Sequence, residues 1–297
     1  MSVGAGGLLR DGAFARTVSA SPDRRLLPEE KSLLARSHEN FIEAFRHFAR
    51  GSPRCRIAEE KGVIRIASGM STSAFNIVFV MRPVEDPDVM VSESRDFMRR
   101  AGVTTWRLVS VGGAAASLAS TLSSDASLKE AKVPGMLLTP VPALAPQLPN
   151  GFRIEPASTP ELWNTMLNVG MQGMGDPWEH VEWVLPYESS GRVRGYLGYE
   201  GQRPVATSLG FSHAGLGGVF FVATLPEVRG RGYGTAMTWQ AITGARDEGC
   251  LTSCLQASKA GYPVYRKMGY RDVVEYSQWR FEAPAVPDVP TAGVYGG

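Results

Sequence analysis

The feature that most constrains the fold is a glycine-rich loop at residues 229–235, which reads Arg-Gly-Arg-Gly-Tyr-Gly-Thr. An apolar run over 218–224 precedes it, and a helical pattern follows it. Glycine permits positive φ angles and lets another molecule approach the backbone closely. The first turn of the following helix leaves several N–H groups unpaired at the positive end of the helix dipole. The order strand, tight loop, helix therefore predicts a phosphate-binding loop.

Two common kinds of phosphate loop do not fit this segment. The spacing Gly232-x-Gly234 lacks the third glycine of the dinucleotide fingerprint, and no Lys-Ser/Thr pair follows as a P-loop requires. The loop must therefore serve a different phosphate ligand.

The segment 229–234 resembles the Arg/Gln-x-x-Gly-x-Gly/Ala acyl-CoA loop of the GNAT (GCN5-related N-acetyltransferase) superfamily. Upstream, residues 222–227 resemble the end of that family's fourth strand. Downstream, residues 262–270 resemble its C-terminal signature, a helix ending in Lys-x-Gly-Phe/Tyr. The three blocks occur in the family's order and separation, and the resemblance covers residues 151 to about 281.

The resemblance implies an α/β (α+β) fold with a mixed, mostly antiparallel sheet flanked by helices. We expect the catalytic domain at 151–282, a proline-rich linker at 140–150, and a first domain at 28–139. The first domain lacks the Arg-x-x-Gly-x-Gly loop and is interpreted as a degenerate second copy in tandem; an unrelated α+β domain is the alternative. Residues 1–27 and 283–297 are expected to be disordered.

The periodicity of apolar residues predicts the elements of both halves. For the first half these are a helix at 28–50, strands at 63–67 and 75–81, a helix at 91–100, a strand at 104–111, a helix at 113–122 and a strand at 136–139. For the second half they are a strand at 152–154, helices at 158–169 and from 176 to 185, a hairpin at 194–199 and 204–211, a strand at 219–224, a helix ending at Gly249, a strand at 251–257, a helix at 264–267 and a strand at 273–281.

Composition restricts the partners. The net charge is +2, and no basic run is interleaved with aromatic residues, so nucleic-acid binding is not expected. The N-terminus has no apolar signal region, and the apolar stretch 135–148 is broken by prolines, so no membrane segment is expected. Three cysteines leave at least one thiol unpaired, which favours the cytoplasm as the compartment. No group of His, Cys, Asp or Glu has the spacing of metal ligands. We expect a small-molecule amine as partner and a monomer or homodimer.

The resemblance implies acetyl-CoA as the acyl donor. Main-chain groups of Val222, Ala223 and Thr224 would pair with its pantetheine arm. Backbone N–H groups of the loop and the Thr235 hydroxyl would hold its diphosphate, with added charge from two arginines; the full set is Arg229, Gly230, Arg231, Gly232, Tyr233, Gly234 and Thr235. The alternative for the two arginines is a solvated surface pair. Ser258 is also placed in the cofactor-binding set, at a position where many members carry Asn.

Tyr265 falls where GNAT enzymes carry a tyrosine that protonates the departing thiolate. A phenol with a pKa near ~10 suits that task. The alternative is a tyrosine packed in the core. Ser258 and Tyr265 both belong to the segment after the predicted strand 251–257.

No general base is evident. Many members carry a Glu on the fourth strand, but residues 219–222 here read Val-Phe-Phe-Val. Water, or one of four side chains of the predicted acceptor wall, is left for the role: Asp176, Glu179, His180 or His213. Glu227 is expected to flank the loop. An apolar acceptor pocket could be lined by Met171, Met174, Trp163, Trp178 and Trp183, which are equally consistent with a helix core.

Together these features predict an N-acetyltransferase that moves acetyl from acetyl-CoA to a primary amine of a small molecule by direct attack, with Tyr265 as general acid. The alternatives are transfer of another acyl group, other acyl-CoA chemistry on the same fold, and a CoA-binding or sensing protein without turnover.

Overall fold

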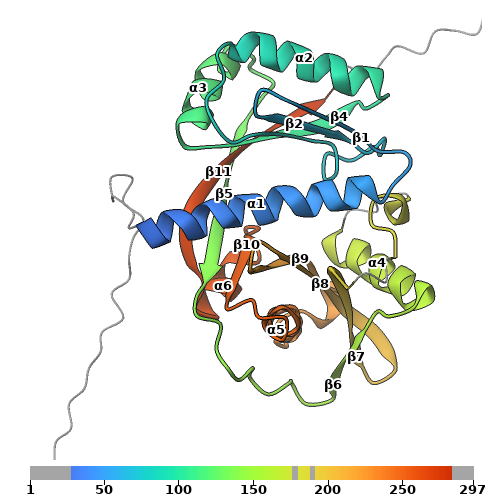
Figure 1. The fold of residues 1–297 in the computed structure, drawn as a ribbon. Coiled ribbons are helices and arrows are strands. Elements are labelled where there is room, and N and C mark those ends of the chain that lie inside the picture. Colours follow the sequence, from blue (N-terminus) through green and yellow to red (C-terminus); the bar gives the residue numbers. More distant parts are fainter. Residues whose placement is uncertain (1–27, 176–179, 188–190, 283–297) are drawn as a thin grey trace, which may run out of the picture.

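The computed structural model describes residues 28–175, 180–187 and 191–282, whose strands form a single 11-stranded sheet (Figure 1). The strand order is β1-β2-β3-β4-β11-β5-β10-β9-β8-β7-β6. Neighbouring strands are antiparallel except in the pairs β3–β4 and β9–β10, which are parallel. The expected mixed, mostly antiparallel sheet flanked by helices is therefore confirmed.

The first half of the chain supplies three α-helices and five strands of this sheet. They are α1 (Pro28–Arg50), β1 (Arg56–Glu60), β2 (Val63–Ala67), β3 (Ile77–Val80), α2 (Pro87–Arg100), β4 (Thr105–Val111), α3 (Gly112–Leu122) and β5 (Glu130–Leu138). The second half supplies β6 (Phe152–Pro156), α4 (Pro160–Met174), η1 (Val181–Trp183), β7 (Val193–Glu200), β8 (Arg203–His213), β9 (Leu216–Thr224), η2 (Pro226–Val228), α5 (Tyr233–Arg246), β10 (Thr252–Gln256), α6 (Tyr262–Lys267) and β11 (Arg271–Glu282).

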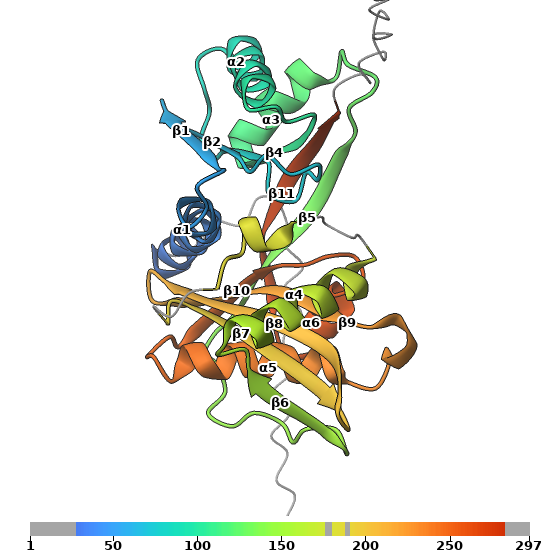
Figure 2. The same ribbon diagram turned by 90° about the vertical axis from the view of Figure 1, so that its right-hand side faces the viewer.

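Two strands interlock the halves. β5, from the first half, lies between β11 and β10, and β11, at the end of the second half, pairs with β4. Both strands run from one half into the other (Figures 1 and 2). The predicted linker at 140–150 does lie between β5 and β6, but ladder hydrogen bonds cross this boundary. The division into 28–139 and 151–282, and the degenerate repeat, stay predictions.

Helix α1 crosses the junction between the halves (Figure 1). It contacts β1 and β2 of the first half and β8 and β9 of the second. Phe41 packs edge-on against Phe79 and Tyr276, at centroid distances of 5.2 and 5.4 Å. The fully buried Asn40 side chain donates to three carbonyls at the ends of β8 and β9, those of Phe211, His213 and Leu216, at 3.1–3.3 Å. This helix thus fixes the first half against the sheet of the second.

Helices α4 and α5 cover opposite faces of the second half of the sheet. On β7, Gly195 faces Trp163 of α4, whereas Gly198 faces Met237 of α5. On β9, Gly217 faces Ala245 of α5. Because side chains alternate along a strand, helices on both faces leave β7–β9 buried on each side.

The predicted elements are largely confirmed, with several differences. β5 begins at Glu130, six residues before the predicted strand 136–139, and α4 extends to Met174, five residues beyond the predicted end at 169. Strand β1 was not predicted, because its polar residues show little apolar alternation. The second helix predicted to end at Leu185 is wrong over residues 180–185, where only the short 3₁₀ helix η1 forms. His180 has φ 61° directly before it, and an α-helix cannot continue through a left-handed residue. Residues 1–27, 176–179, 188–190 and 283–297 lie outside the described part of the chain.

Two kinds of feature are absent from the described residues. No helix there is long and apolar enough to cross a membrane. Within the same residues, no three His, Cys, Asp or Glu side chains gather in a way that could hold a metal ion.

Candidate active site

The site is built on a split between two neighbouring parallel strands. β9 pairs with β10 only where Leu216–Gly218 lie beside Thr252–Cys254. β9 then continues to Thr224, while the other edge of β10 keeps its pairing with β5 through Gln256. The strands therefore separate beyond Gly218. Val222, Ala223 and Thr224 lie on the separated part of β9, and their pairing with a pantetheine arm stays a prediction.

A β-bulge shapes the separated part of β9. The register shifts between Thr207 and Leu209, so two residues of β9, Phe221 and Val222, oppose one residue of β8. Phe221 has φ 52°, and its carbonyl accepts a hydrogen bond from Thr207 Oγ1 at 3.0 Å. Bulges and strained non-glycine residues are common beside active sites, where they re-aim the chain. Nothing in the sequence of this strand signals the bulge.

Two glycines let α4 lie directly against this bulge. A Cβ atom on Gly170 would overlap the Phe221 ring, and one on Gly173 would lie 2.9 Å from Ala223 Cβ. Residues larger than glycine would push α4 away from the split. Residues 171–174 form the last turn of α4, and Gly175 follows them as its left-handed C-cap.

The glycine-rich loop lies between η2 and α5, directly after β9. Gly230 has φ 80° and Gly232, the N-cap of the 14-residue α5, has φ 83°. Among the described residues, no acceptor is found for the backbone N–H groups from Gly230 to Thr235. These groups therefore remain available at the positive end of the helix dipole, which is a favourable place for a phosphate. The geometry agrees with the loop predicted from the sequence.

The side chains of the loop have structural partners of their own. Arg229 donates from Nε to the Thr224 carbonyl at 3.1 Å and from Nη2 to the Gly173 carbonyl at 2.6 Å. Arg231 forms an ion pair with Glu200, whose Oε1 also accepts a hydrogen bond from the Tyr233 hydroxyl at 2.8 Å. These contacts tie the loop to β9, α4 and β7.

Tyr233 also stacks on the ring of Phe152, with centroids 4.1 Å apart. Its side chain is therefore part of the core, and only its backbone belongs to the row of available N–H groups. The Thr235 side chain is half-buried in the first turn of α5. The contacts of Glu200 with Arg231 and Tyr233 and the stacking of Tyr233 on Phe152 were not predicted, because both depend on the register of β6 and β7.

Tyr265 lies on α6, directly after β10, and is 9% exposed. Its ring packs edge-on against Tyr270 with a centroid distance of 5.8 Å. Within the described residues its hydroxyl has no hydrogen-bond partner, and burial raises the pKa of Tyr265 to about 12. The phenol is therefore protonated at neutral pH and is able to donate its proton. Ser258 is exposed, and its Oγ accepts from the Gly261 N–H at 3.1 Å at the start of α6.

The candidate bases are spread over the molecule. His213 lies at the end of β8 farthest from Thr224 and approaches Glu39 of α1 at 3.3 Å, so it is not beside the loop. His180 precedes η1, and its Nδ1 lies 3.4 Å from Glu182 Oε1. Glu227 pairs with Arg203, which agrees with its predicted place flanking the loop. Asp176 and Glu179 lie outside the described residues.

The predicted acceptor residues on α4 differ in exposure. Trp163 is 2% exposed, and its Nε1 donates to the Leu185 carbonyl at 2.7 Å, which makes it a core residue. Met171 is half-buried and Met174 is exposed. Trp178 and the side chain of Trp183 lie outside the described part of the structure.

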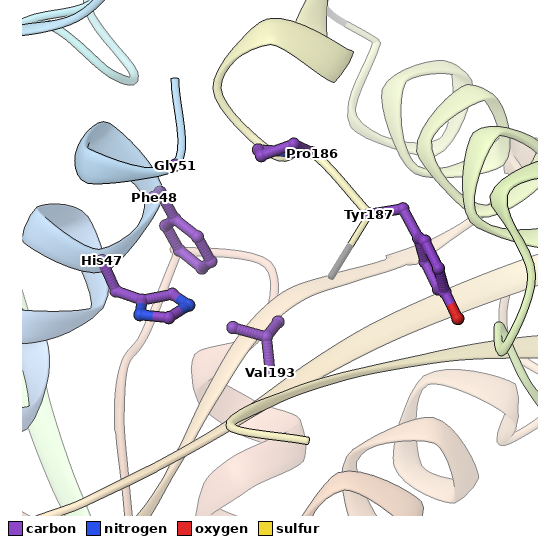
Figure 3. Close-up of a pocket in the computed structure, with 6 residues that line it drawn as sticks. All are labelled: His47, Phe48, Gly51, Pro186, Tyr187 and Val193. Atoms are coloured by element: carbon purple, nitrogen blue, oxygen red, sulfur yellow. The ribbon is translucent and has the colours of Figure 1, made fainter. Parts of the chain in front are cut away.

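A pocket of about 160 Å³ lies between the end of α1 and the segment around Pro186 (Figure 3). In Figure 3, His47 and Phe48 of α1 face Pro186, Tyr187 and Val193 of the second half across this space. Its volume is below the roughly 300 Å³ at which small-molecule pockets begin. It lies away from the glycine-rich loop, and the strand split, not this pocket, is the candidate site.

Comparison with known proteins supports the same region. The acetyltransferase (GNAT) family model matches residues 152–270. No curated protein matches the chain significantly. A GCN5-related N-acetyltransferase from Kribbella flavida has a similar structure, with a TM-score of 0.62 and 16% identity over 85% of this chain and 98% of its own.

Two further solved structures show the same fold. A GCN5-related N-acetyltransferase from Sphaerobacter thermophilus has a TM-score of 0.56 and 16% identity, over 89% of this chain and 96% of its own. A tandem GNAT protein from the clavulanic acid biosynthesis pathway has a TM-score of 0.51 and 12% identity, over 79% and 85%. At these identities the likeness concerns the fold, and it extends over both halves of the chain.

Proposed function

We propose that this chain acetylates a primary amine of a small molecule with acetyl-CoA. The proposal starts from residues 152–270, which match the acetyltransferase (GNAT) family and make the chain an acyltransferase of that superfamily. The observation that carries the proposal is the row of available N–H groups from Gly230 to Thr235 at the foot of the strand split. This combination offers a diphosphate site and, next to it, free strand edges for an extended thioester arm.

The diphosphate of acetyl-CoA would be held by the backbone, with the Thr235 hydroxyl as a further donor. Because Arg231 is paired with Glu200 and Arg229 is bonded to two carbonyls, most of the attraction comes from N–H groups and the α5 dipole. The pantetheine arm would then extend along Val222, Ala223 and Thr224, where β9 has separated from β10. This arrangement points the thioester into the split.

Acyl transfer then proceeds by direct attack. The neutral amine nitrogen forms a bond to the thioester carbonyl carbon, the C–S bond breaks, and the thiolate takes a proton. We assign that proton to Tyr265, whose burial keeps it protonated. The described part of β9 carries no carboxylate, and we assign removal of the amine proton to water.

The proposal is tested by incubating the purified full-length protein with acetyl-CoA, propionyl-CoA and succinyl-CoA, each with a panel of primary amines. Mass spectrometry should detect an amine product heavier by one acetyl group, together with one free thiol per product. Preference for a longer acyl-CoA would contradict the acetyl donor. Binding of acetyl-CoA without thiol release from any combination would replace the proposal by a CoA-binding function.

A further inference from the structure

Arg107 lies on β4, in the first half of the chain. It is opposite Ile77 of β3 and Arg280 of β11 in the sheet register. Its guanidinium carbon lies 5.6 Å from the centroid of the Phe45 ring on α1, and its Nη2 donates to the Ala74 carbonyl at 3.1 Å. The side chain is therefore directed to the face of the sheet that α1 covers.

This guanidinium has no acidic partner among the described residues. Its Nε is buried and without a hydrogen-bond partner. The residue opposite it, Arg280, is also cationic and pairs with Glu282 at 2.9 Å. Burial lowers the pKa of Arg107 to about 10, which still leaves it charged at neutral pH. Arg107 as a whole is half-buried, with its Nε fully covered, and a charge withdrawn from water without a counter-ion is costly.

The surroundings of Arg107 join the first half to the acceptor wall. Phe45 and Phe75 line a small cavity together with Val184, the residue that follows η1. Phe45 and Ala74, the two residues that Arg107 contacts, pack against the same apolar cluster as Met171 of α4 and Phe220 and Phe221 of β9. Phe45 also belongs, with Phe220 of β9, to the smaller cluster between α1 and the sheet, so Arg107 contacts an apolar cluster that reaches the separated part of β9.

We propose that Arg107 binds a carboxylate group of the amine acceptor, so that the acceptor belongs to the class of amino acids; this rests on the function proposed above. A planar guanidinium matches a carboxylate in geometry, and a single unpaired cation matches it in charge. A phosphate would bring up to two charges to a single guanidinium, because Arg280, opposite it in the sheet register, already has a partner. The aromatic side chains of Phe45 and Phe220 in this smaller cluster suit an apolar body between the two ends of the acceptor.

The test compares amino acids with their carboxamides as acceptors for the full-length protein. With acetyl-CoA and thiol detection, the wild type should prefer the acids by about 10- to 100-fold in kcat/KM, because a charged hydrogen bond is lost in the amide. The variant R107M should remove this preference mainly through KM, and R107K should restore part of it.

The matched control is R95M. Arg95 lies over Phe281 on the opposite face of the sheet and pairs with Asp125, so this variant should keep the wild-type preference. R107M should fold with an unchanged or higher melting temperature, because methionine removes an unpaired buried charge. An equal preference in R107M and wild type would overturn the proposal, and so would preference for an aminoalkyl phosphate over the amino acids.

A second measurement does not require turnover. Calorimetry in the presence of CoA should show N-acetyl amino acids binding to the wild type at least tenfold more tightly than to R107M. If that holds while no amine is acetylated, the carboxylate site stands and the acetyltransferase function fails. If N-acetyl amino acids and their amides bind equally well, the carboxylate site is wrong, whatever the result of the acetylation assay.

Discussion

Replacing Tyr265 by phenylalanine removes one hydroxyl that has no hydrogen-bond partner among the described residues. If this hydroxyl protonates the thiolate, kcat should fall by about 10²- to 10⁴-fold, the usual contribution of a general acid. This corresponds to about 3–5 kcal/mol in the activation free energy. The free energy of unfolding should hardly change, because the ring remains and no protein hydrogen bond is lost.

The matched control is Tyr270→Phe, on the neighbouring tyrosine. The Tyr270 hydroxyl lies 2.6 Å from Ser253 Oγ and is fully buried, so its loss should reduce stability by about 1 kcal/mol. Its kcat should stay within about twofold of the wild type, since it has a structural role. Stopped-flow detection of the free thiol and urea denaturation of both variants give the required values.

The pH dependence provides a further check on Tyr265. Because burial raises its pKa to about 12, its proton is retained well above neutral pH. Ionisation of this group should therefore cause no alkaline fall in kcat below about pH 10. Activity of Tyr265→Phe within threefold of the wild type would refute the assignment of the general acid, as would an alkaline fall near pH 8 that the variant abolishes.

Three other experiments test separate parts of the structure. Gly232 and Gly249 lie at opposite ends of α5 with φ angles of 83° and 89°, so replacing either by alanine should cost about 1 kcal/mol of stability. Calorimetry should find weaker acetyl-CoA binding only for Gly232→Ala. Burial lowers the pKa of His38 to about 4, whereas the unfolded chain keeps the ordinary value of 6.5. Between these two values only the unfolded chain binds the proton, so the free energy of unfolding is highest above pH 6.5 and falls as the pH drops toward 4. Urea denaturation should show a loss of about 2 kcal/mol between pH 7 and 5 that is absent in His38→Gln. Gly170→Ala should destabilise the fold by about 1–3 kcal/mol through overlap with Phe221, and an added Phe221→Leu should relieve part of this in thermal melts.

Local patterns predicted the elements that depend on neighbouring residues. The apolar spacing placed α1 at 28–50, where the structure has it, and the strand, glycine loop and helix order located the available N–H groups before α5. The turn residues at 200–203 likewise located the hairpin of β7 and β8. These features follow from residues close together in the chain, so a sequence pattern is sufficient to find them.

Features that depend on distant contacts could not be predicted. Pairing of β11 with both β4 and β5 joins residues more than 130 positions apart, and no local pattern encodes it. The left-handed conformation of Phe221 is imposed by the bulge opposite Thr207 and Leu209. Arg229 was predicted to add charge for phosphates, but its hydrogen bonds to Thr224 and Gly173 became evident only once α4 was placed against β9.

The binding of the diphosphate by backbone amides is tested most directly by NMR of protein labelled with ¹⁵N-glycine. On titration with acetyl-CoA, the amide resonances of Gly230, Gly232 and Gly234 should shift, while that of Gly249 at the other end of α5 should not. Acetyl-pantetheine, which lacks the diphosphate, should leave the three loop resonances nearly unchanged. Saturation of the protein with acetyl-CoA without any movement of the loop glycines would contradict the account.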